Sequence, residues 1–299
     1  MLGFLLIDKP EHMGSFDCVR WLRKILNVRR IGFVGTLDPL ASGLMIFAIG
    51  EATKLIPYLE GLDKVYEVTA TFGAVSDSYD ADGKITELEV ASAGVKRAVR
   101  PGRAGIEQVL SERFSGEVLQ VPPVYSAIKV EGKRAYARAR GGEKLKMKAR
   151  KVFFHSICLA SQRWPRARFT VHCGSGTYIR SFVHDLGQIL GCGAYVEKLR
   201  RTKIGDYTVE NAIAPDRINT KNAHKYIIAP QDFFLDKNVI VLSSEEYKTL
   251  ANGGFISARK LKKISSSHTS GPLLAVYEKV CVGVLEPFKG QLKFHRKFL

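Results

Sequence analysis

The segment from Gly35 to Gly43 reads Gly-Thr-Leu-Asp-Pro-Leu-Ala-Ser-Gly and constrains the chain path more than any other stretch. Asp38 precedes Pro39, and a residue before proline is pushed out of the α region towards an extended conformation. The two flanking glycines permit positive φ or the close approach of another backbone. An apolar run at residues 46–49 follows and predicts a buried strand. The pattern predicts a rigid loop that presents one acid at the edge of a sheet, although an ordinary Asp-Pro turn has the same local signature.

The charge of the chain points to a polyanionic partner. Its 299 residues carry 46 Lys and Arg against 29 Asp and Glu, which leaves a net charge of +17 and a pI near 9.7. Such an excess favours polyanions and accelerates encounter with them. Nucleic acid is the first candidate, an anionic membrane surface is the second, and a generally basic surface is the third. The length fits one large domain, or a main domain with a small second one.

The remaining composition argues against several protein classes. The five cysteines form no C-x-x-C pair and the seven histidines show no metal-ligand spacing, so we expect no metal and no disulfide framework. No Ser-His-Asp or Cys-His arrangement stands out, and a cofactor motif is missing, so we expect no cofactor. The apolar N-terminal run is interrupted by Asp8 and Lys9 and is not a signal peptide. No run of about 18 apolar residues occurs, so we expect no membrane span. The scattered cysteines fit reduced thiols, so we expect a cytoplasmic protein.

Apolar periodicity predicts a chain of mixed secondary structure. The predicted strands of the first 235 residues cover residues 4–7 (a central strand), 46–49, 63–73, 152–160, 168–173 and 207–209. The predicted helices cover residues 16–28, with Ser15 as N-cap, and 106–114, and the glycine-rich turn at 174–180 enters a third through Ser181, Phe182, Leu186 and Leu190. After a linker near Asp236, the short predicted strands 239–242, 273–277 and 281–286 and the helix 244–251 indicate a small, mostly β module.

Three polar segments complete the local picture. Residues 76–83 resemble a calcium loop but lack the glutamate at its twelfth position, so we interpret them as a solvated turn. From Lys129 to Lys151 the chain holds ten Lys or Arg and only two acids. That composition fits either a solvated charge run or a flexible arm that contacts RNA phosphates. The basic loop at 91–105 receives no role.

Several longer motifs occur in an order that resembles one enzyme family. They are residues 5–10 (Leu-Leu-Ile-Asp-Lys-Pro), 35–43, 50–54 (Gly-Glu-Ala-Thr-Lys), 64–66 (Lys-Val-Tyr), 120–129 (Gln-Val-Pro-Pro-Val-Tyr-Ser-Ala-Ile-Lys), 176–181 (Gly-Thr-Tyr-Ile-Arg-Ser) and 199–202 (Leu-Arg-Arg-Thr). Each motif is weak alone, but the set in this order and spacing is highly specific. The chain resembles the bacterial tRNA pseudouridine synthases of the TruB type over nearly its whole length.

The resemblance implies roles for individual residues. Asp38 corresponds to the catalytic aspartate of the family, and Arg180 corresponds to the arginine that pairs with it. Tyr66 corresponds to the tyrosine that stacks on the target base and is placed to help with the proton at C5. Tyr178 corresponds to a second tyrosine of the active site.

Three more positions complete the site that the resemblance implies. Leu199 corresponds to the apolar residue that closes the pocket, and Lys129 to a lysine near the site. Phe33 departs from the family pattern, because the family usually has a histidine there, in Gly-His-Thr or Gly-His-Val. That histidine is thought to occupy the space of the flipped nucleotide. A phenylalanine can stack there but offers no imidazole hydrogen bond.

The resemblance also implies a fold and a reaction. The fold would be α+β, a mixed and mainly antiparallel sheet flanked by helices, with a catalytic domain at 1–235 and a PUA-like, mostly β RNA-binding module at 236–299. A basic insertion at about 124–151 would clamp RNA. The substrate would be the uridine at position 55 in the T-arm loop of tRNA, flipped out of its stack. Isomerising it to pseudouridine involves no redox change and no net addition of atoms, so no cofactor is required.

Two alternative functions stay open. The chain could be a non-catalytic protein that binds or folds tRNA, or a guide-RNA-dependent pseudouridine synthase. Three points of action also stay open for Asp38, namely attack on the sugar C1′, addition to the base at C6, and removal of a sugar proton. We expect a monomer that recognises the T-arm stem-loop of tRNA without an obligate protein partner.

Overall fold

A mixed sheet forms the centre of the molecule. The computed structural model describes residues 1–88, 100–126, 147–234, 238–259 and 271–298, together with residues 128–130, 132–135, 138, 141, 143 and 145. The strands of the central sheet are β1 (Gly3–Lys9), β2 (Ile31–Val34), β3 (Ser42–Ile49), β4 (Lys64–Phe72), β7 (Gly116–Gln120), β10 (Arg150–Arg163), β11 (Arg166–Cys173), β12 (Ala194–Ile204) and β13 (Tyr207–Thr208). Their order is β1-β3-β12-β4-β11-β10-β7, with β2 beside β3 and β13 beside β12. Among these strands of the central sheet, as far as the structure describes them, β3 and β12 pair in parallel and all other neighbours are antiparallel. The predicted mixed, mainly antiparallel sheet is therefore confirmed.

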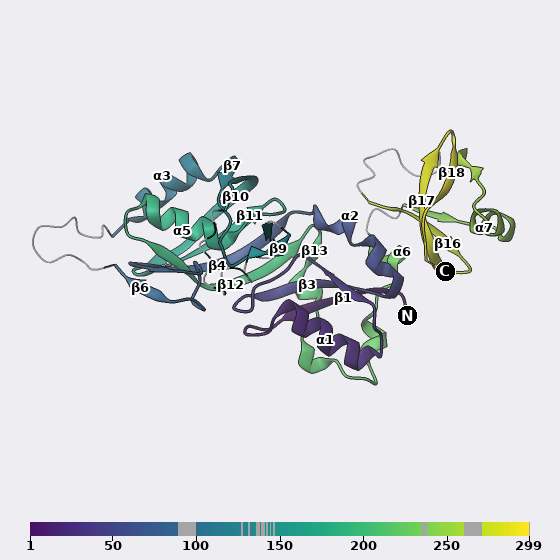
Figure 1. Cartoon of the computed structure of the whole chain (residues 1–299), viewed down its shortest axis with the longest axis horizontal. Helices are drawn as coiled ribbons and strands as arrows, with labels where there is room; N and C mark the ends of the chain where they lie inside the picture. Colours follow the sequence, from purple (N-terminus) through teal and green to yellow (C-terminus); the bar gives the residue numbers. More distant parts are fainter. Residues whose placement is uncertain are drawn as a thin grey trace, which may run out of the picture.

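Helices and small hairpins surround this sheet. The helices are α1 (Ser15–Leu26), α2 (Pro57–Glu60), α3 (Arg103–Arg113), α5 (Ile179–Ile189) and α6 (Pro230–Phe233), with 3-10 turns η1 (Gly50–Leu55), η2 (Val209–Asn211), η3 (Pro215–Arg217) and η4 (Ala223–Tyr226). The hairpins are β5 (Ala74–Ser76) with β6 (Ile85–Glu87), and β8 (Lys129–Val130) with β9 (Lys133–Arg134). Figure 1 shows α3 and α5 together at one end of the sheet and α1 beside β1 and β3 at the other.

The C-terminal residues form a second, smaller sheet. Its elements are β14 (Val239–Val241), α7 (Ser244–Ala251), β15 (Ile256–Ser257), β16 (Leu273–Tyr277), β17 (Val280–Phe288) and β18 (Gln291–Lys297). The strand order is β14-β16-β17-β18-β15, and Figure 1 shows this sheet as a separate body beyond the central one. The predicted small, mostly β module is therefore confirmed. The predicted boundary near Asp236 lies outside the described residues and stays a prediction.

The two faces of the central sheet are buried against different partners. Strands β1 and β3 alternate: Leu5 and Phe47 point into a core shared with α1, α3 and α5, while Phe4 and Ile46 point into a second core. That second core includes η1, α6 and apolar side chains of β16 and β17. Burial on both faces explains why residues 4–7 and 44–49 are continuously apolar rather than alternating. None of the helices in the described part of the chain has the length and apolar character needed to span a bilayer.

Two local predictions need correction. Strand β1 is not central, because it is the last strand of its path; its apolar character comes from the two cores, and its outer edge is covered by bridges to Ile213 and Ile228. Ser15 is not the N-cap of α1, because the helix begins at Ser15 itself and Gly14 precedes it with extended dihedral angles. The Ser15 hydroxyl instead holds the loop that carries Asp38, which is described below.

The sheet contains a fork where that loop lies. Strand β3 pairs along Ile46–Ile49 with β2, and at its beginning it pairs with β12, through Ser42 and Gly43. The loop between β2 and β3 therefore starts where one neighbour of β3 ends and the next begins. Gly43 has φ +109°, and a Cβ there would lie 2.2 Å from the carbonyl oxygen of Arg201 on β12. Only glycine lets the two backbones approach this closely.

We predict that Gly43→Ala destabilises the fold. The added Cβ collides with backbone, which has no rotamer to relieve the clash, and the φ angle is strained for alanine. The free energy of unfolding should fall by about 3 kcal/mol or more in urea titrations. Gly105→Ala is the matched control, because Gly105 lies in α3 with nothing near the position of its Cβ. It should gain up to about 1 kcal/mol from helix propensity. Equal stabilities of the two variants would contradict the close approach at the fork.

Candidate active site

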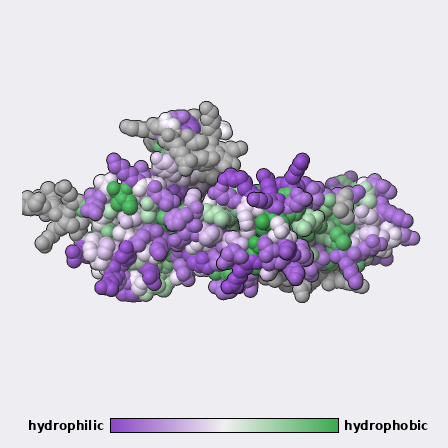
Figure 2. Space-filling model, turned by 90° about the horizontal axis from the view of Figure 1, so that it is seen from below, coloured by the Kyte–Doolittle hydropathy of each residue, from purple (hydrophilic) through white to green (hydrophobic). Residues whose placement is uncertain are grey.

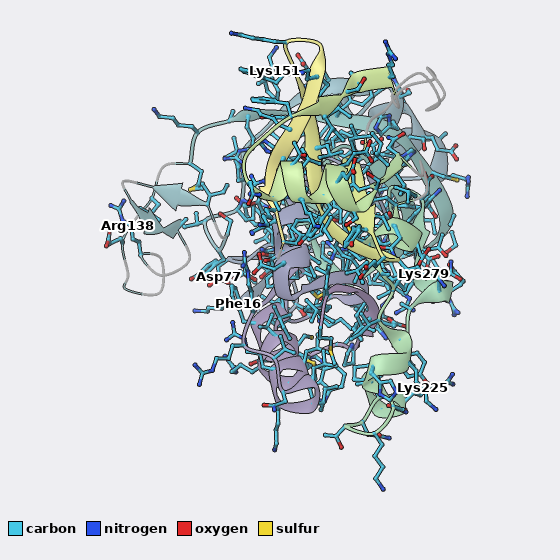
Figure 3. All side chains as sticks on the ribbon, turned by 90° about the vertical axis from the view of Figure 1, so that its right-hand side faces the viewer. Phe16, Asp77, Arg138, Lys151, Lys225 and Lys279 are labelled. Atoms are coloured by element: carbon cyan, nitrogen blue, oxygen red, sulfur yellow. The ribbon has the colours of Figure 1, made fainter. Side chains whose placement is uncertain are left out.

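The loop between β2 and β3 (residues 35–41) is called the fork loop below. A cavity of about 900 Å³ lies where this loop, β4, β12 and the start of α5 meet. Asp38, Tyr66, Tyr178 and Arg180 all line it, although they come from three separate segments of the chain: the loop after β2, strand β4 and the start of α5. The cavity has the size of a pocket for a small organic group such as one nucleotide. Phe16 and Asp77, which also line it, lie close together in Figure 3, on the side from which the segment with Arg138 projects.

The loop that carries Asp38 is held by short hydrogen bonds. The Ser15 hydroxyl donates to the carbonyl oxygen of Leu37 (2.7 Å) and accepts from its backbone N–H (2.9 Å). The carbonyl oxygen of Asp38 accepts from the backbone N–H of Ala41 at 3.1 Å. The side chain of Asp38 remains 34% exposed, towards the cavity. The expected loop with a single presented acid is therefore what the structure contains.

Arg180 connects four parts of the site through one guanidinium group. Its Nε lies 2.9 Å from Oδ2 of Asp38, and its Nη2 donates to Oδ1 of the same residue at 3.1 Å. Its Nη1 lies 3.1 Å from Oδ2 of Asp80 and donates to the carbonyl oxygen of Ser78 at 3.0 Å. Its Nη2 also donates to the carbonyl oxygen of Tyr125 at 2.8 Å. The side chain is only 6% exposed, so these contacts are made away from bulk water.

Asp80 was missed by the sequence-based interpretation. Residues 76–83 are not a solvated turn, because Ser76, Ser78 and Asp80 are all less than 9% exposed. The Asp80 carboxylate accepts from the Ser78 hydroxyl and from the backbone N–H of Asp82, in addition to its ion pair with Arg180. The sequence did contain a signal for this burial. Ser76, Ser78 and Asp80 stand at every second position, a spacing typical of an extended segment with one buried side. Composition concealed it, since small polar residues usually mark a turn.

Two opposing effects act on the Asp38 carboxyl. Burial in the cavity wall is the larger effect and raises the pKa of Asp38 above its usual value. The Arg180 guanidinium opposes this rise, and the nearby Asp80 carboxylate adds to it. Asp38 therefore depends on its arginine to stay ionised, and Asp80 weakens that effect while it holds the arginine in place.

Tyr66 and Arg201 form the floor of the cavity. They face each other as cross-strand partners on β4 and β12. Tyr66 is 9% exposed, and burial raises the pKa of its phenol, an effect that the charge of Arg201 only partly offsets. Arg201 is 1% exposed and donates to the carbonyl oxygens of Leu44 (2.8 Å) and Gly35 (3.2 Å). Leu199, two residues earlier on β12, also lines the cavity. Arg201 belongs to a recognised motif, but its role as a buried support was not anticipated.

Tyr178 is positioned by Gln120, the last residue of β7. Its backbone N–H donates to Oε1 of Gln120 (2.8 Å), and its carbonyl oxygen accepts from Nε2 of the same side chain (3.0 Å). One turn into α5, the Ser181 hydroxyl donates to the carbonyl oxygen of Val121 at 2.7 Å. Burial raises the pKa of the Tyr178 phenol. The motif at 120–129 therefore serves, in its first residues, to hold the beginning of α5.

Two buried lysines support the loops around the cavity. Lys9 is fully buried, and its Nζ donates to the carbonyl oxygens of Met13 (2.7 Å) and Pro39 (3.4 Å). Lys64 is 6% exposed, lines the cavity and donates to the carbonyl oxygen of Glu60 at 2.8 Å. Burial lowers the pKa of each lysine to about 8. Both cations therefore bind backbone oxygens and remain largely protonated at neutral pH.

Phe33 does not line the cavity, and the side chain of Lys129 lies outside the described residues. Phe33 lies outside the lining of the cavity and packs edge-on against Phe16, with ring centroids 5.3 Å apart, and against Phe47 at 6.0 Å. Phe16 is the aromatic residue that lines the cavity there, and it is 50% exposed. The backbone of Lys129 lies in β8, and its side chain is outside the described residues.

Comparison with known families decides the class of the protein. The model described as TruB family pseudouridylate synthase (N terminal domain) matches residues 23–179, more than half of the chain. The chain belongs to the TruB family. A model described as tRNA pseudouridylate synthase B C-terminal domain matches residues 180–230 of this TruB-family chain. The protein is therefore a pseudouridine synthase, an isomerase, as the motifs predicted.

Relatives with curated names cover nearly the whole chain. The tRNA pseudouridine synthase B of Syntrophomonas wolfei is 39% identical over 290 residues, which cover 93% of each protein. The tRNA pseudouridine synthase B of Cupriavidus metallidurans is 37% identical over 301 residues and covers 98% of this chain and 93% of its own length. The match to the TruB family is therefore not confined to the residues around the cavity.

Solved structures share the fold of this TruB-family chain. A chain of an H/ACA RNP bound to a substrate RNA containing 2′-deoxyuridine matches with a TM-score of 0.65 at 20% identity, over 99% of this chain and 85% of that one. A chain of a Cbf5-Nop10-Gar1 complex matches with a TM-score of 0.64 at 21% identity, over the same shares. At this identity the likeness concerns the fold alone, and it confirms the predicted α+β pseudouridine synthase fold.

We predict that the pKa of Asp38 responds in opposite directions to its two charged neighbours. Asp80→Asn removes a negative charge and should lower the pKa of Asp38, whereas Arg180→Met removes a positive charge and should raise it. Carboxyl ¹³C NMR of aspartate-labelled protein, titrated with pH, measures both shifts. Asp77→Asn is the control, because Asp77 lines the same cavity but is not among the groups that shift Asp38. A rise in Asp80→Asn would show that Asp80 acts only by holding Arg180.

Proposed function

We propose that this chain converts the uridine at position 55 in the T-arm loop of tRNA to pseudouridine, with Asp38 as the reactive carboxylate. Its membership of the TruB family and its curated relatives support isomerisation of uridine in tRNA. The observation that carries the assignment of Asp38 is its setting. It is an acid held on two oxygens by a buried arginine, with its side chain still open to a cavity of nucleotide size.

The reaction places defined demands on these residues. The N1–C1′ bond breaks, a C5–C1′ bond forms, the C5 proton leaves and N1 gains a proton, so no atoms are added overall. An ionised carboxylate at the cavity serves each of the three points of action, at C1′, at C6 or at a sugar proton. Arg180 supports all three, because it stabilises the charged form of Asp38 by a charge-assisted pair.

Tyr66 acts as a platform for the detached base. Burial raises the pKa of its phenol, so the group is neutral at physiological pH. A neutral phenol can stack on a base and donate a hydrogen bond. It can accept the C5 proton only if the phenol gives its own O–H proton to another group. Leu199 closes the apolar side of the same cavity. Stacking on an aromatic ring offsets part of the cost of flipping the base, roughly 1–3 kcal/mol per base.

Phe16 replaces Phe33 as the aromatic candidate for contact with the RNA. It is half exposed and lines the cavity, whereas Phe33 packs behind it. An exposed aromatic side chain beside the cavity can fill the space that a flipped nucleotide leaves in its stack. We therefore infer that Phe16, and not Phe33, contacts the RNA. Phe33 packs against the ring of Phe16 and holds it in place.

The surface and the C-terminal module favour a nucleic-acid partner. The net charge is +17, and the face in Figure 2 consists mostly of hydrophilic residues with small apolar patches. The basic insertion at 124–151 includes Tyr125 and Ser126, which line the cavity, and Arg138, which Figure 3 shows on the same side of the molecule as the cavity residues Phe16 and Asp77. We infer that this insertion clamps the T-arm and that the mostly β module acts as a PUA-like RNA contact.

The two alternative functions make different predictions. A protein that only binds or folds tRNA releases no tritium from C5-labelled uridine, whereas an isomerase does. A guide-RNA-dependent synthase is inactive on naked tRNA. The H/ACA RNP structures share only the fold of this chain, while the tRNA pseudouridine synthase B relatives share more than a third of its residues. We therefore propose activity on tRNA alone, by a monomer without a protein partner.

We predict that Asp38→Asn abolishes the reaction without abolishing binding. Tritium release from C5-labelled uridine in tRNA should fall on the order of 10³-fold or more, because the amide supplies no charge to the reaction. Filter binding should show tRNA affinity within a few-fold of the wild type. Asp77→Asn, an isosteric change in the same cavity, should retain activity. Normal tritium release by Asp38→Asn would remove Asp38 from the mechanism.

We predict a steep salt dependence of tRNA binding that reports the basic insertion. Each phosphate contact contributes a slope of about 0.7–0.9 in a plot of log affinity against log salt concentration. Lys148→Gln combined with Lys151→Gln should reduce the slope by about 1.4–1.8. Lys221→Gln combined with Lys225→Gln is the control, because both lysines are exposed and lie outside the insertion and the C-terminal module; Figure 3 shows Lys225 on the side away from Arg138. Equal slopes for the two double variants would exclude this part of the insertion from the RNA contact.

A further inference from the structure

Two histidines and one aspartate meet at the outer face of the central sheet. Nε2 of His155 lies 3.0 Å from Oδ2 of Asp63, and Nε2 of His172 lies 3.9 Å from the same oxygen. The three donor atoms all lie within 4.8 Å of one another. The two imidazole rings are 4.4 Å apart between centroids. We propose that this cluster is a binding site for a divalent transition-metal ion, of which Zn²⁺ is the representative.

The fold brings the three residues together through a β-bulge. On β10 and β11, Phe154 pairs with Cys173 and Ser156 pairs with His172, so His155 is an extra residue in β10. A bulge re-aims a side chain and is retained where that direction matters. Here it turns His155 to the same exposed face as its neighbour His172 across the strands.

Asp63 reaches the cluster from the beginning of β4. It is the residue before that strand, and its carbonyl oxygen accepts from the backbone N–H of Gly205 at 2.8 Å. The cluster therefore joins three adjacent strands whose backbones are already held by the ladder. Because the donor groups are placed before any ion arrives, binding does not have to order a flexible loop.

The distances fit a tetrahedral ion with three protein ligands. With bonds of about 2.0–2.2 Å to nitrogen and oxygen, neighbouring ligand atoms in a tetrahedral site lie about 3.3–3.6 Å apart. The observed separations of 3.0 and 3.9 Å bracket this range, so small rotations of the side chains suffice. Imidazole and carboxylate ligands suit Zn²⁺ and related ions. The side chains are 34–45% exposed, which leaves the fourth position to water.

This site lies on the opposite face of the sheet from the active-site cavity. His172 is the cross-strand partner of Val65, whereas Val171 is the partner of Tyr66, which lines the cavity. Successive side chains of a strand point to opposite faces. The ion would therefore cross-link the strands behind the cavity and would not touch the substrate. Asp63 is the neighbour of Lys64 in the sequence, and Lys64 lines the cavity. One ligand of the ion would therefore lie next to a residue of the cavity wall.

Zinc binding by the full-length protein tests this proposal. Protein treated with a chelator is titrated with Zn²⁺ in competition with a chromophoric chelator, in a Cys158→Ser background that removes the exposed thiol on β10. We expect one Zn²⁺ per chain and a higher melting temperature in its presence. His155→Ala and His172→Ala should each weaken binding by about 100-fold or more, because loss of a supporting residue alone costs 10–100-fold. Co²⁺ should give d–d absorption bands without a thiolate charge-transfer band.

His295→Ala is the matched control. Nδ1 of His295 lies 2.9 Å from Oε2 of Glu286, so this pair is also an exposed histidine beside a carboxylate. It lacks the second histidine and should leave zinc affinity unchanged. If His295→Ala weakened binding as much as His155→Ala, or if both cluster variants bound Zn²⁺ like the parent, the proposal would be wrong. Absence of any binding by the parent would reduce the cluster to a hydrogen-bonded pair of Asp63 and His155.

Discussion

The site depends on one buried cation, the guanidinium of Arg180. Its contacts with Asp38, Asp80 and two backbone carbonyls join the fork loop, the segment after β5, the segment after β7 and the start of α5. A buried charge without partners costs several kcal/mol of folding free energy. Displacing any one of these segments would remove a partner of the guanidinium and would therefore destabilise the whole cluster. The same contacts that hold the fold together therefore set the direction and the ionisation of the proposed reactive carboxylate.

A second buried arginine secures the frame around this cluster. Arg201 supports the fork through the carbonyl oxygens of Gly35 and Leu44, and its own backbone lies against Gly43. The loop of Asp38 is thus fixed at both ends by β12, while Ser15 holds its middle. The acid is placed rigidly, so in the proposed function the contacts with the flipped RNA fall to two aromatic side chains, Tyr66 in the floor and Phe16 at the exposed side.

Much of this arrangement could be predicted before the structure was known. Continuous apolar runs identified the strands at residues 4–7 and 46–49, and a glycine-rich turn marked the beginning of α5. The order of short motifs identified the family. It also predicted five site residues that the structure brings to one cavity: Asp38, Arg180, Tyr66, Tyr178 and Leu199. The errors share a cause. A segment was interpreted from its composition where its partners decide its environment, as with residues 76–83, whose buried Asp80 looked like part of a solvated turn.

The sequence by itself determined the local frame and the class of chemistry: an acid before a proline between two glycines, a strongly basic chain, and motifs whose order identifies a family. The tertiary structure alone decided which distant residues meet. Asp80 pairs with Arg180 across 100 positions, Arg201 reaches the carbonyl of Gly35, and a bulge in β10 places His155 beside His172 and Asp63. The physical reason is that a hydrogen bond or an ion pair depends on distance in space. Sequence spacing records that distance only within one element.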